Sequence, residues 1–421
     1  MSSISIFPFK KMWPGNRRPA EGVDFDDSSK LLPEVPRKRR SSVRKTNPWM
    51  VEPVYSTLLT QQDIGSLPFG WNSSPGTGVA DGDNIRPIGG RGIDGGPRFN
   101  QPVTPGGYLW WYIDGTSENG THAFSLIIFV GSVFSPYYSL AKARDLKSAD
   151  PENFCSFNLA LYNQDKKIWT MTEFSKKHIN RKNDCFEVAN SKIEWKNNRI
   201  EIEIDEIATP FPKRINGKIT VSANKFFLYS TWLDDDKKHR WGPLAPHADV
   251  TVEFPGLNLN WSGHGYCDSN EGDEPLENPF YGWNWAKAHL EDDTVLVFYD
   301  IKQKKGRERV LPLRFFPDGS VKRIAPPPRE DLPATKWFIP RFMRAEPARP
   351  AHILKNLEDT PFYARSMLSA GLLGDRQLVM HETLNLDRYS NSLVKTLLPW
   401  RMPRIRSEEH TSELQSPMYL V

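Results

Sequence analysis

Apolar and charged residues alternate with a period of two in this chain, and this pattern restricts its fold more than any other feature. In one such segment, Ile200, Ile202 and Ile204 are separated by acidic residues. Successive side chains of a β-strand point to opposite faces, so the segment is predicted to be a strand with one buried face. Four further segments repeat the alternation or are continuous apolar runs typical of strands covered on both faces: 123–130, 250–254, 257–261 and 294–299.

Turn and helix signals separate the predicted strands. The segment 317–319 (Pro-Asp-Gly) lies between two apolar runs and predicts a hairpin turn. One helix is expected, because Thr360 suits a capping position, Pro361 suits the first helical position and Gly374 suits the end. About a dozen strand segments and one helix signal therefore predict a mainly β protein, an antiparallel barrel or sandwich in two units.

The 421 residues are expected to form two folded units between two tails. Residues 1–97 are rich in proline, glycine, serine and charge, and are predicted to be a disordered basic extension. The first β-unit is expected over residues 98–255 and the second over 256–405, with the break at Pro255-Gly256. Residues 406–421 change abruptly in character, resemble translated adapter sequence and contribute nothing to the fold prediction.

The net charge of +4 is unevenly distributed, because residues 1–50 carry +6 and the other 371 residues carry −2. A near-neutral body argues against nucleic-acid binding. The basic segment 36–45 (PRKRRSSVRK) is either a solvated linker or a contact with an anionic membrane, where each basic residue contributes about 1 kcal/mol. The longest apolar stretch, 123–134, is shorter than the roughly 20 residues of a membrane span. With no signal-peptide pattern, we expect a cytoplasmic protein that contacts the cytoplasmic face of the membrane.

Several standard catalytic motifs are missing from the sequence, namely H-E-x-x-H, zinc-type cysteine pairs, the G-x-S-x-G elbow and the P-loop. Cys155, Cys185 and Cys267 are scattered and are expected to be small buried residues. The segment 268–270 begins like a calcium loop, but Pro279 stands where the closing glutamate belongs. No metal site is therefore predicted.

Two pairs of residues could carry acid–base chemistry. Tyr266 and Asp268 are two positions apart, so on a strand they share a face, with Trp261 on the opposite face. A buried aspartate has a raised pKa and suits a general acid. The alternative is that Asp268 caps a turn that follows it. His239 and Trp241 also alternate, so they would share a face in an extended segment.

Aromatic residues form a third group of candidates. Trp110, Trp111 and Tyr112 follow one another in a predicted first strand, and Trp283 lies close to the acidic residues after Asp268. Such side chains line apolar cavities or stack on sugar rings. The alternative is core packing of the strand, which the period of two would assign to about half of them.

Seven ordered segments of the chain resemble the carotenoid 1,2-hydratases, the hydroxyneurosporene synthases of purple bacteria. The resemblance as a whole runs from about Arg98 to Arg404, roughly three-quarters of the chain. The segments are GGYLWWYIDG (106–115), FVGSVFSPYY (129–138), DPENFCSFNLALY (150–162), DEIATPFPKRI (205–215), HRWGPLAPHA (239–248), WSGHGYCDSNEGDEPLE (261–277) and LEDTPFYARSML (357–368). The resemblance implies two consecutive lipocalin-like β-barrel units. It also implies cofactor-independent addition of water to the terminal 1,2 double bond of acyclic carotenoids such as neurosporene and lycopene.

The resemblance also implies which residues are catalytic. The family's His-x-Trp and Tyr-x-Asp pairs fall on His239, Trp241, Tyr266 and Asp268. In the hydration that it implies, Asp268 would protonate C2 of the alkene, and Trp241 and Tyr266 would stabilise the tertiary cation at C1 by about 0.5–2 kcal/mol per contact. His239 would orient or deprotonate the water that adds at C1. We expect the site at the junction of the two units. The expected substrate-binding residues are Trp110, Trp111, Tyr112 and Trp283.

Three other functions stay open at this stage. Paired tryptophans and a cluster of acids (Glu271, Asp273 and Glu274, with Asp268) suit a glycan-binding or glycan-cleaving β-protein. A lipocalin-like architecture also suits a carrier that returns its carotenoid unchanged, or a pericyclase, although the intact residue pairs favour hydration. The sequence settles neither the preferred carotenoid nor the oligomeric state.

Overall fold

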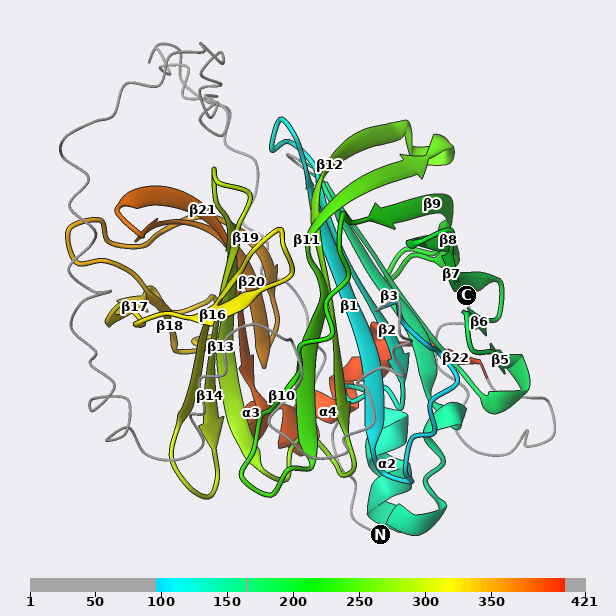
Figure 1. The fold of residues 1–421 in the computed structure, drawn as a ribbon. Coiled ribbons are helices and arrows are strands. Elements are labelled where there is room, and N and C mark those ends of the chain that lie inside the picture. Colours follow the sequence, from blue (N-terminus) through cyan, green and yellow to red (C-terminus); the bar gives the residue numbers. More distant parts are fainter. Residues whose placement is uncertain (1–95, 164–165, 406–421) are drawn as a thin grey trace, which may run out of the picture. The chain divides into compact units, whose positions relative to one another are not determined.

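Two large β-sheets, antiparallel except for one parallel pair at the edge of the first, make up most of the computed structural model, which describes residues 96–163 and 166–405 (Figure 1). The predicted mainly β class with few short helices is confirmed. Residues 1–95, which include the basic segment 36–45, and the tail 406–421 lie outside the described residues. The predictions of a disordered extension and of a foreign tail therefore stay predictions.

The first sheet has thirteen strands in the order β22-β4-β3-β2-β1-β12-β11-β9-β8-β7-β6-β5, with β10 paired to β11. Its strands are β1 (Tyr108–Ser117), β2 (Ala123–Val130), β3 (Cys155–Tyr162), β4 (Lys167–Phe174), β5 (Ile179–Arg181), β6 (Cys185–Val188), β7 (Ser191–Lys196), β8 (Arg199–Ile207), β9 (Arg214–Ser222), β10 (Thr231–Trp232), β11 (His239–Phe254), β12 (Leu259–Gly272) and β22 (Arg404–Ile405). The sheet curls strongly, and an isolated bridge between Thr170 and Ala208 links β4 to the end of β8.

The second sheet has seven strands in the order β16-β15-β14-β13-β21-β20-β19. They are β13 (Phe280–His289), β14 (Val295–Gln303), β15 (Arg309–Phe315), β16 (Val321–Arg323), β19 (His352–Asp359), β20 (Tyr363–Leu372) and β21 (Asp375–Asn385). A separate hairpin of β17 (Arg329–Leu332) and β18 (Arg341–Arg344) covers its outer face, where Leu332 and Met343 pack with Phe298.

Short helices connect the strands. The α-helices are α2 (Pro136–Arg144), α3 (Leu386–Ser390) and α4 (Ser392–Leu397). The 3₁₀ turns are Leu146–Ser148, Pro151–Asn153, Lys176–His178, Pro255–Leu257 and Leu398–Trp400. Within the described residues, the structure has no helix that is long and apolar enough to cross a membrane.

The period of two separates the two faces of the first sheet. On β8, Ile200, Ile202 and Ile204 are buried inside the curl, which confirms the predicted half-buried strand. On β1, Trp111 faces this inner core, whereas its neighbour Tyr112 faces the second sheet. The two large sheets therefore pack through a second core, which lies between them and is rich in aromatic side chains.

The predicted break at Pro255-Gly256 falls in the tight turn between β11 and β12. Both strands belong to the first sheet, and Phe254 pairs with Leu259 across the turn. The chain passes to the second sheet only after Gly272, before β13 begins at Phe280. The Pro-Gly pair thus marks a hairpin, because turn residues close hairpins within a sheet as readily as they join two units.

The predicted helix that begins at Thr360 is wrong. Residues 363–372 form strand β20, and Gly374 lies in the turn before β21 with φ of +87°. The Thr360 hydroxyl does accept from the backbone N–H of Tyr363, as a helix cap would, but here it closes a turn between β19 and β20. The predicted hairpin turn at 317–319 is confirmed, because it joins the paired strands β15 and β16.

Candidate active site between the two sheets

Asp268 lies on β12, on the face that points to the second sheet. Its Oδ2 atom accepts two hydrogen bonds, from Trp241 Nε1 at 2.7 Å and from the Tyr266 hydroxyl at 2.8 Å. Its Oδ1 atom is buried and has no hydrogen-bond partner among the described residues. Since Asp268 lies inside a strand that continues to Gly272, it does not cap a turn. The structure thus brings three of the four predicted catalytic residues into direct contact.

Burial controls the acidity of Asp268, whose side chain is only 4% exposed. Loss of solvation raises its pKa to about 7, and the negative charges of Glu382 and Asp114 act in the same direction. The hydrogen bonds from Trp241 and Tyr266 oppose this shift because they stabilise the carboxylate. The balance leaves a carboxyl group that is substantially protonated near neutral pH, which a general acid requires.

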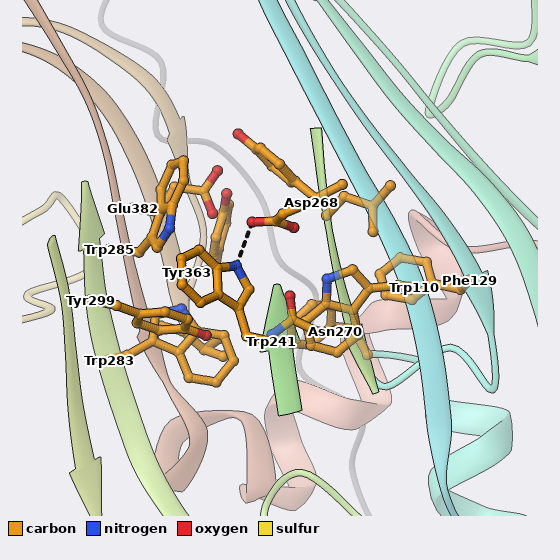
Figure 2. A pocket seen from close by; sticks show the side chains of 14 residues that line it. Trp110, Phe129, Trp241, Asp268, Asn270, Trp283, Trp285, Tyr299, Tyr363 and Glu382 are labelled. Carbon is orange, nitrogen blue, oxygen red and sulfur yellow. Dashed lines mark hydrogen bonds between the residues drawn. The ribbon is translucent and has the colours of Figure 1, made fainter. Parts of the chain in front are cut away.

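A pocket with about 500 Å³ of empty space, part of it open to solvent, lies beside Asp268 (Figure 2). Nine of its fourteen lining side chains are aromatic, so it suits an apolar substrate. The polar lining consists of Asp268, Asn270 and Glu382. Strands of both sheets contribute, so the pocket lies at the packing surface between them.

The predicted substrate-binding residues separate into two groups. Trp110, Tyr112 and Trp283 line the pocket. Trp111 does not, because its side chain points to the inner core of the first sheet and packs against Phe99. Adjacent residues of a strand point to opposite faces, so a run of aromatics on β1 cannot line one pocket as a whole.

His239 lies apart from the other three predicted catalytic residues. It begins β11 and pairs with Gly272, whereas Asp268 pairs with Pro243 further along the strand. The imidazole does not line the pocket. Its Nδ1 atom is 2.9 Å from the Tyr108 hydroxyl, and burial lowers its pKa. Tyr108 in turn stacks on Trp110, so His239 reaches the pocket through two aromatic rings.

Sequence reasoning missed an acidic residue in the pocket, Glu382 of β21. Arg365 Nε on the neighbouring strand β20 donates a 2.7 Å hydrogen bond to Glu382 Oε1. Both side chains are buried. Its partner Arg365 forms a period-two pair with Tyr363, which the predicted helix obscured, but no local pattern around Glu382 itself marks it as a pocket residue.

A buried ion pair lies next to the two tyrosines that flank Asp268. Asp114 of β1 pairs with Lys287 of β13, so it joins the two sheets. The Tyr112 hydroxyl donates to Asp114 at 2.8 Å, and the Lys287 ammonium lies 5.0 Å from the centre of the Tyr266 ring. These contacts fix the two tyrosines that flank Asp268.

The other acids considered for glycan chemistry lie outside the pocket. Glu271 is engaged with Arg240 and accepts from Gln101 at 2.6 Å. Neither Glu271, Asp273 nor Glu274 lines the pocket. The geometry instead defines a β-sheet protein with a protonatable carboxyl group in an aromatic pocket.

Comparison with known proteins identifies the family. The family model for the carotenoid hydratase CrtC matches residues 126–411. The chain is 45% identical to the acyclic carotenoid 1,2-hydratase of Rubrivivax gelatinosus over 90% of this chain and 93% of that protein. It is 38% identical to the protein of the same name from Thiocapsa roseopersicina, over 90% and 93%. The chain belongs to the carotenoid hydratase family, which makes it an enzyme that hydrates carotenoids.

Among solved structures, kievitone hydratase from Nectria haematococca is similar at 12% identity, with a TM-score of 0.44 over 74% of this chain and 98% of that one. This likeness is too distant to bear on the fold or the function.

Proposed function

We propose that this enzyme adds water to the terminal 1,2 double bond of acyclic carotenoids, such as neurosporene or lycopene, and gives 1-hydroxy carotenoids. The observation that supports the proposal best is the buried Asp268 carboxyl group, with a pKa of about 7 and an unpartnered oxygen, in an aromatic pocket. The names of the relatives point to the same reaction. No cofactor enters the proposed reaction.

In the proposed mechanism Asp268 is the general acid. Its proton is transferred to C2 of the alkene, the π electrons form the new C–H bond, and a tertiary cation remains at C1. Trp241, which lines the pocket, presents an electron-rich ring near this cation, and such a contact contributes about 0.5–2 kcal/mol. Tyr266 does not line the pocket and acts through its hydrogen bond to Asp268. Water then bonds to C1 through an oxygen lone pair and releases one proton. The sum of the steps is the addition of one water molecule.

His239 is assigned a positioning role in this proposal. A histidine that takes a proton from the attacking water must reach it, and the imidazole is separated from the pocket by Tyr108 and Trp110. Through its contact with the Tyr108 hydroxyl it holds the stacked ring of Trp110 against the pocket. His239→Gln should therefore raise KM more than it lowers kcat, whereas loss of a base would lower kcat.

Replacement of the acid tests the function. The wild type incubated with lycopene in D₂O should give a 1-hydroxy product with one deuterium at C2. Asp268→Asn cannot donate the proton and should lose at least 10²-fold in kcat, with circular dichroism to show that it folds. Near-wild-type turnover in Asp268→Asn, or a product without deuterium at C2, would overturn the mechanism.

We further propose that the protein binds the surface of an anionic membrane. The segment 388–405 contains four basic residues and no acidic residue, and three of the four have no carboxylate partner among the described residues, since only Arg404 forms an ion pair, with Glu173. Val394 of α4 and Leu398 of the 3₁₀ turn that follows it pack towards the core between the sheets, whereas Leu393 and Leu397 of α4 point away and are 67% and 48% exposed. An exposed apolar stripe beside basic side chains suits a layer of anionic lipid, which is also where a water-insoluble substrate would be found.

A further inference from the structure

Hydration needs a proton acceptor as well as a donor. The water that bonds to C1 carries an extra proton until a base removes it, and a base within reach contributes about 10²–10⁴-fold. Of the predicted catalytic residues, Asp268 has just donated its own proton, and His239 does not line the pocket. The sequence-based assignments therefore leave the second half of the reaction without a dedicated acceptor.

Glu382 meets the requirement. Among the described residues, it is the second carboxylate that lines the pocket, and it comes from β21 of the second sheet, whereas Asp268 comes from β12 of the first. Figure 2 shows the two side chains projecting into the same space. Glu382 pairs in register with Trp285, a further aromatic residue of the lining.

The partners of Glu382 hold it in place. Arg365 Nε binds Glu382 Oε1 at 2.7 Å, and the same guanidinium contacts Ser125 and the Tyr162 hydroxyl, the latter at 2.9 Å. The positive charge of Arg365 compensates the charge of the buried carboxylate. The charge of Glu382 also contributes to the raised pKa of Asp268, so each carboxyl group lies within the electrostatic field of the other.

We propose that Glu382 is the general base of the hydration, a role that rests on the proposed function. As the water oxygen bonds to the cation at C1, one O–H bond breaks and its proton passes to Glu382. At that point Asp268 is ionised and Glu382 is neutral. Exchange with water after product release moves the proton back, so the cycle consumes no other reactant. Donor and acceptor then lie on different sheets, with the alkene between them.

The proposal predicts a change in the fate of the cation. In Glu382→Gln, Asp268 still protonates C2, but the attacking water has lost its base. The cation then returns its proton more often than it is captured. In D₂O, deuterium should therefore accumulate at C2 of the recovered lycopene relative to the hydrated product, while kcat for hydration falls by at least tenfold and KM changes little. Glu382→Asp keeps the carboxylate and should recover part of kcat.

Glu358→Gln is the matched control. Glu358 is a buried carboxylate in the same network, since it accepts from the Tyr162 hydroxyl at 3.1 Å and pairs with Lys167 at 2.7 Å, but it does not line the pocket. This variant should keep the wild-type ratio of exchange to hydration. Any change that Glu358→Gln does cause measures the effect of disturbing the hydrogen bonds around Arg365 without removing a carboxylate from the pocket.

Three outcomes would contradict the proposal. Glu382→Gln with kcat within twofold of wild type excludes a base at this position. Equal loss of hydration and of deuterium exchange, or the same change in Glu358→Gln, would show that Glu382 only supports the structure. A wild-type protein that neither hydrates nor exchanges lycopene would overturn the proposed function itself, and this inference with it.

Discussion

Trp241 Nε1 donates a 2.7 Å hydrogen bond to Asp268 Oδ2, although the two residues are 27 positions apart and lie on neighbouring strands. The bond stabilises the carboxylate, which works against the effect of burial on the pKa of Asp268. Trp241 therefore sets how much of the acid is protonated at a given pH, in addition to any contact of its ring with the cation. The two roles can be separated, because only the hydrogen bond to Asp268 shifts the pH dependence of turnover.

The pH dependence of turnover follows from the pKa of about 7 for Asp268. The protonated acid is the active form, so kcat/KM should be constant between about pH 5 and pH 6 and fall tenfold per pH unit well above pH 7. Trp241→Phe removes a hydrogen bond that favours the charged form, worth about 1.5–3 kcal/mol. The midpoint of the fall should move about one to two units upward. Profiles of kcat/KM between pH 5 and pH 9 measure both.

A control for this profile is Trp111→Phe, because Trp111 lies on the opposite face of β1 from the pocket. Its midpoint should equal that of the wild type. A Trp241→Phe midpoint that is unchanged, or that moves downward, would show that the hydrogen bond does not tune the acid.

Local patterns in the sequence predicted a large part of this site. Tyr266 and Asp268 share a face because strand geometry places residues i and i+2 together, and no long-range information is needed. Their hydrogen bond over 2.8 Å is the direct consequence. The same rule placed Trp261 on the opposite face, where it packs against the inner core of the first sheet.

The rest depends on contacts between distant parts of the chain. Glu382 reaches the pocket only because β21 pairs with β13 and the second sheet packs on the first. No local pattern gives that arrangement. The Thr360-Pro361 signal failed for another reason, because a side-chain oxygen that accepts an N–H three residues later closes a turn as well as it begins a helix. The position of His239 depends on where β11 begins relative to the pocket.

Two adjacent tryptophans should respond differently to truncation. Trp111→Ala leaves a hole in the inner core of the first sheet and should lower the free energy of unfolding by about 3–5 kcal/mol. Trp110→Ala enlarges the pocket and should raise KM for lycopene more than Trp111→Ala does. Urea unfolding and steady-state kinetics on both variants provide the comparison. If Trp111→Ala instead had the larger effect on KM in the folded protein, the assignment of faces would be at fault.

Membrane binding should depend on the outer face of α4. Leu393→Asn with Leu397→Asn removes two exposed apolar side chains and should weaken binding to vesicles that contain phosphatidylglycerol by tenfold or more. Binding should also fall with salt, because basic side chains contribute. Leu354→Asn with Leu378→Asn, two exposed leucines of the second sheet, is the control and should bind as the wild type does. Equal binding to vesicles of phosphatidylcholine alone would argue against a role for charge.

Glu206 should make stability depend on pH. It is buried, accepts one hydrogen bond of 2.9 Å from Ser191, and burial raises its pKa from 4.5 to about 8. The folded state holds this proton more tightly than the unfolded state does. Stability is therefore highest below about pH 4.5 as far as this group is concerned, and declines as the pH rises to about 8, by several kcal/mol. Glu206→Gln should remove this decline in urea unfolding between pH 5 and pH 9. A slope equal to that of the wild type would assign the dependence to other groups.

Substitutions of Asp114 and Lys287, which form an ion pair, should have non-additive effects on the free energy of unfolding. Both side chains are buried, and they join β1 to β13 across the core between the sheets. Lys287→Met leaves the Asp114 charge without a cationic partner and should lower the free energy of unfolding by about 3–5 kcal/mol at neutral pH. Asp114→Asn in the same chain removes the stranded charge, so the double variant should be more stable than Lys287→Met alone. A double-mutant cycle in urea measures the coupling, and additive losses would mean that the pair contributes little to holding the two sheets together.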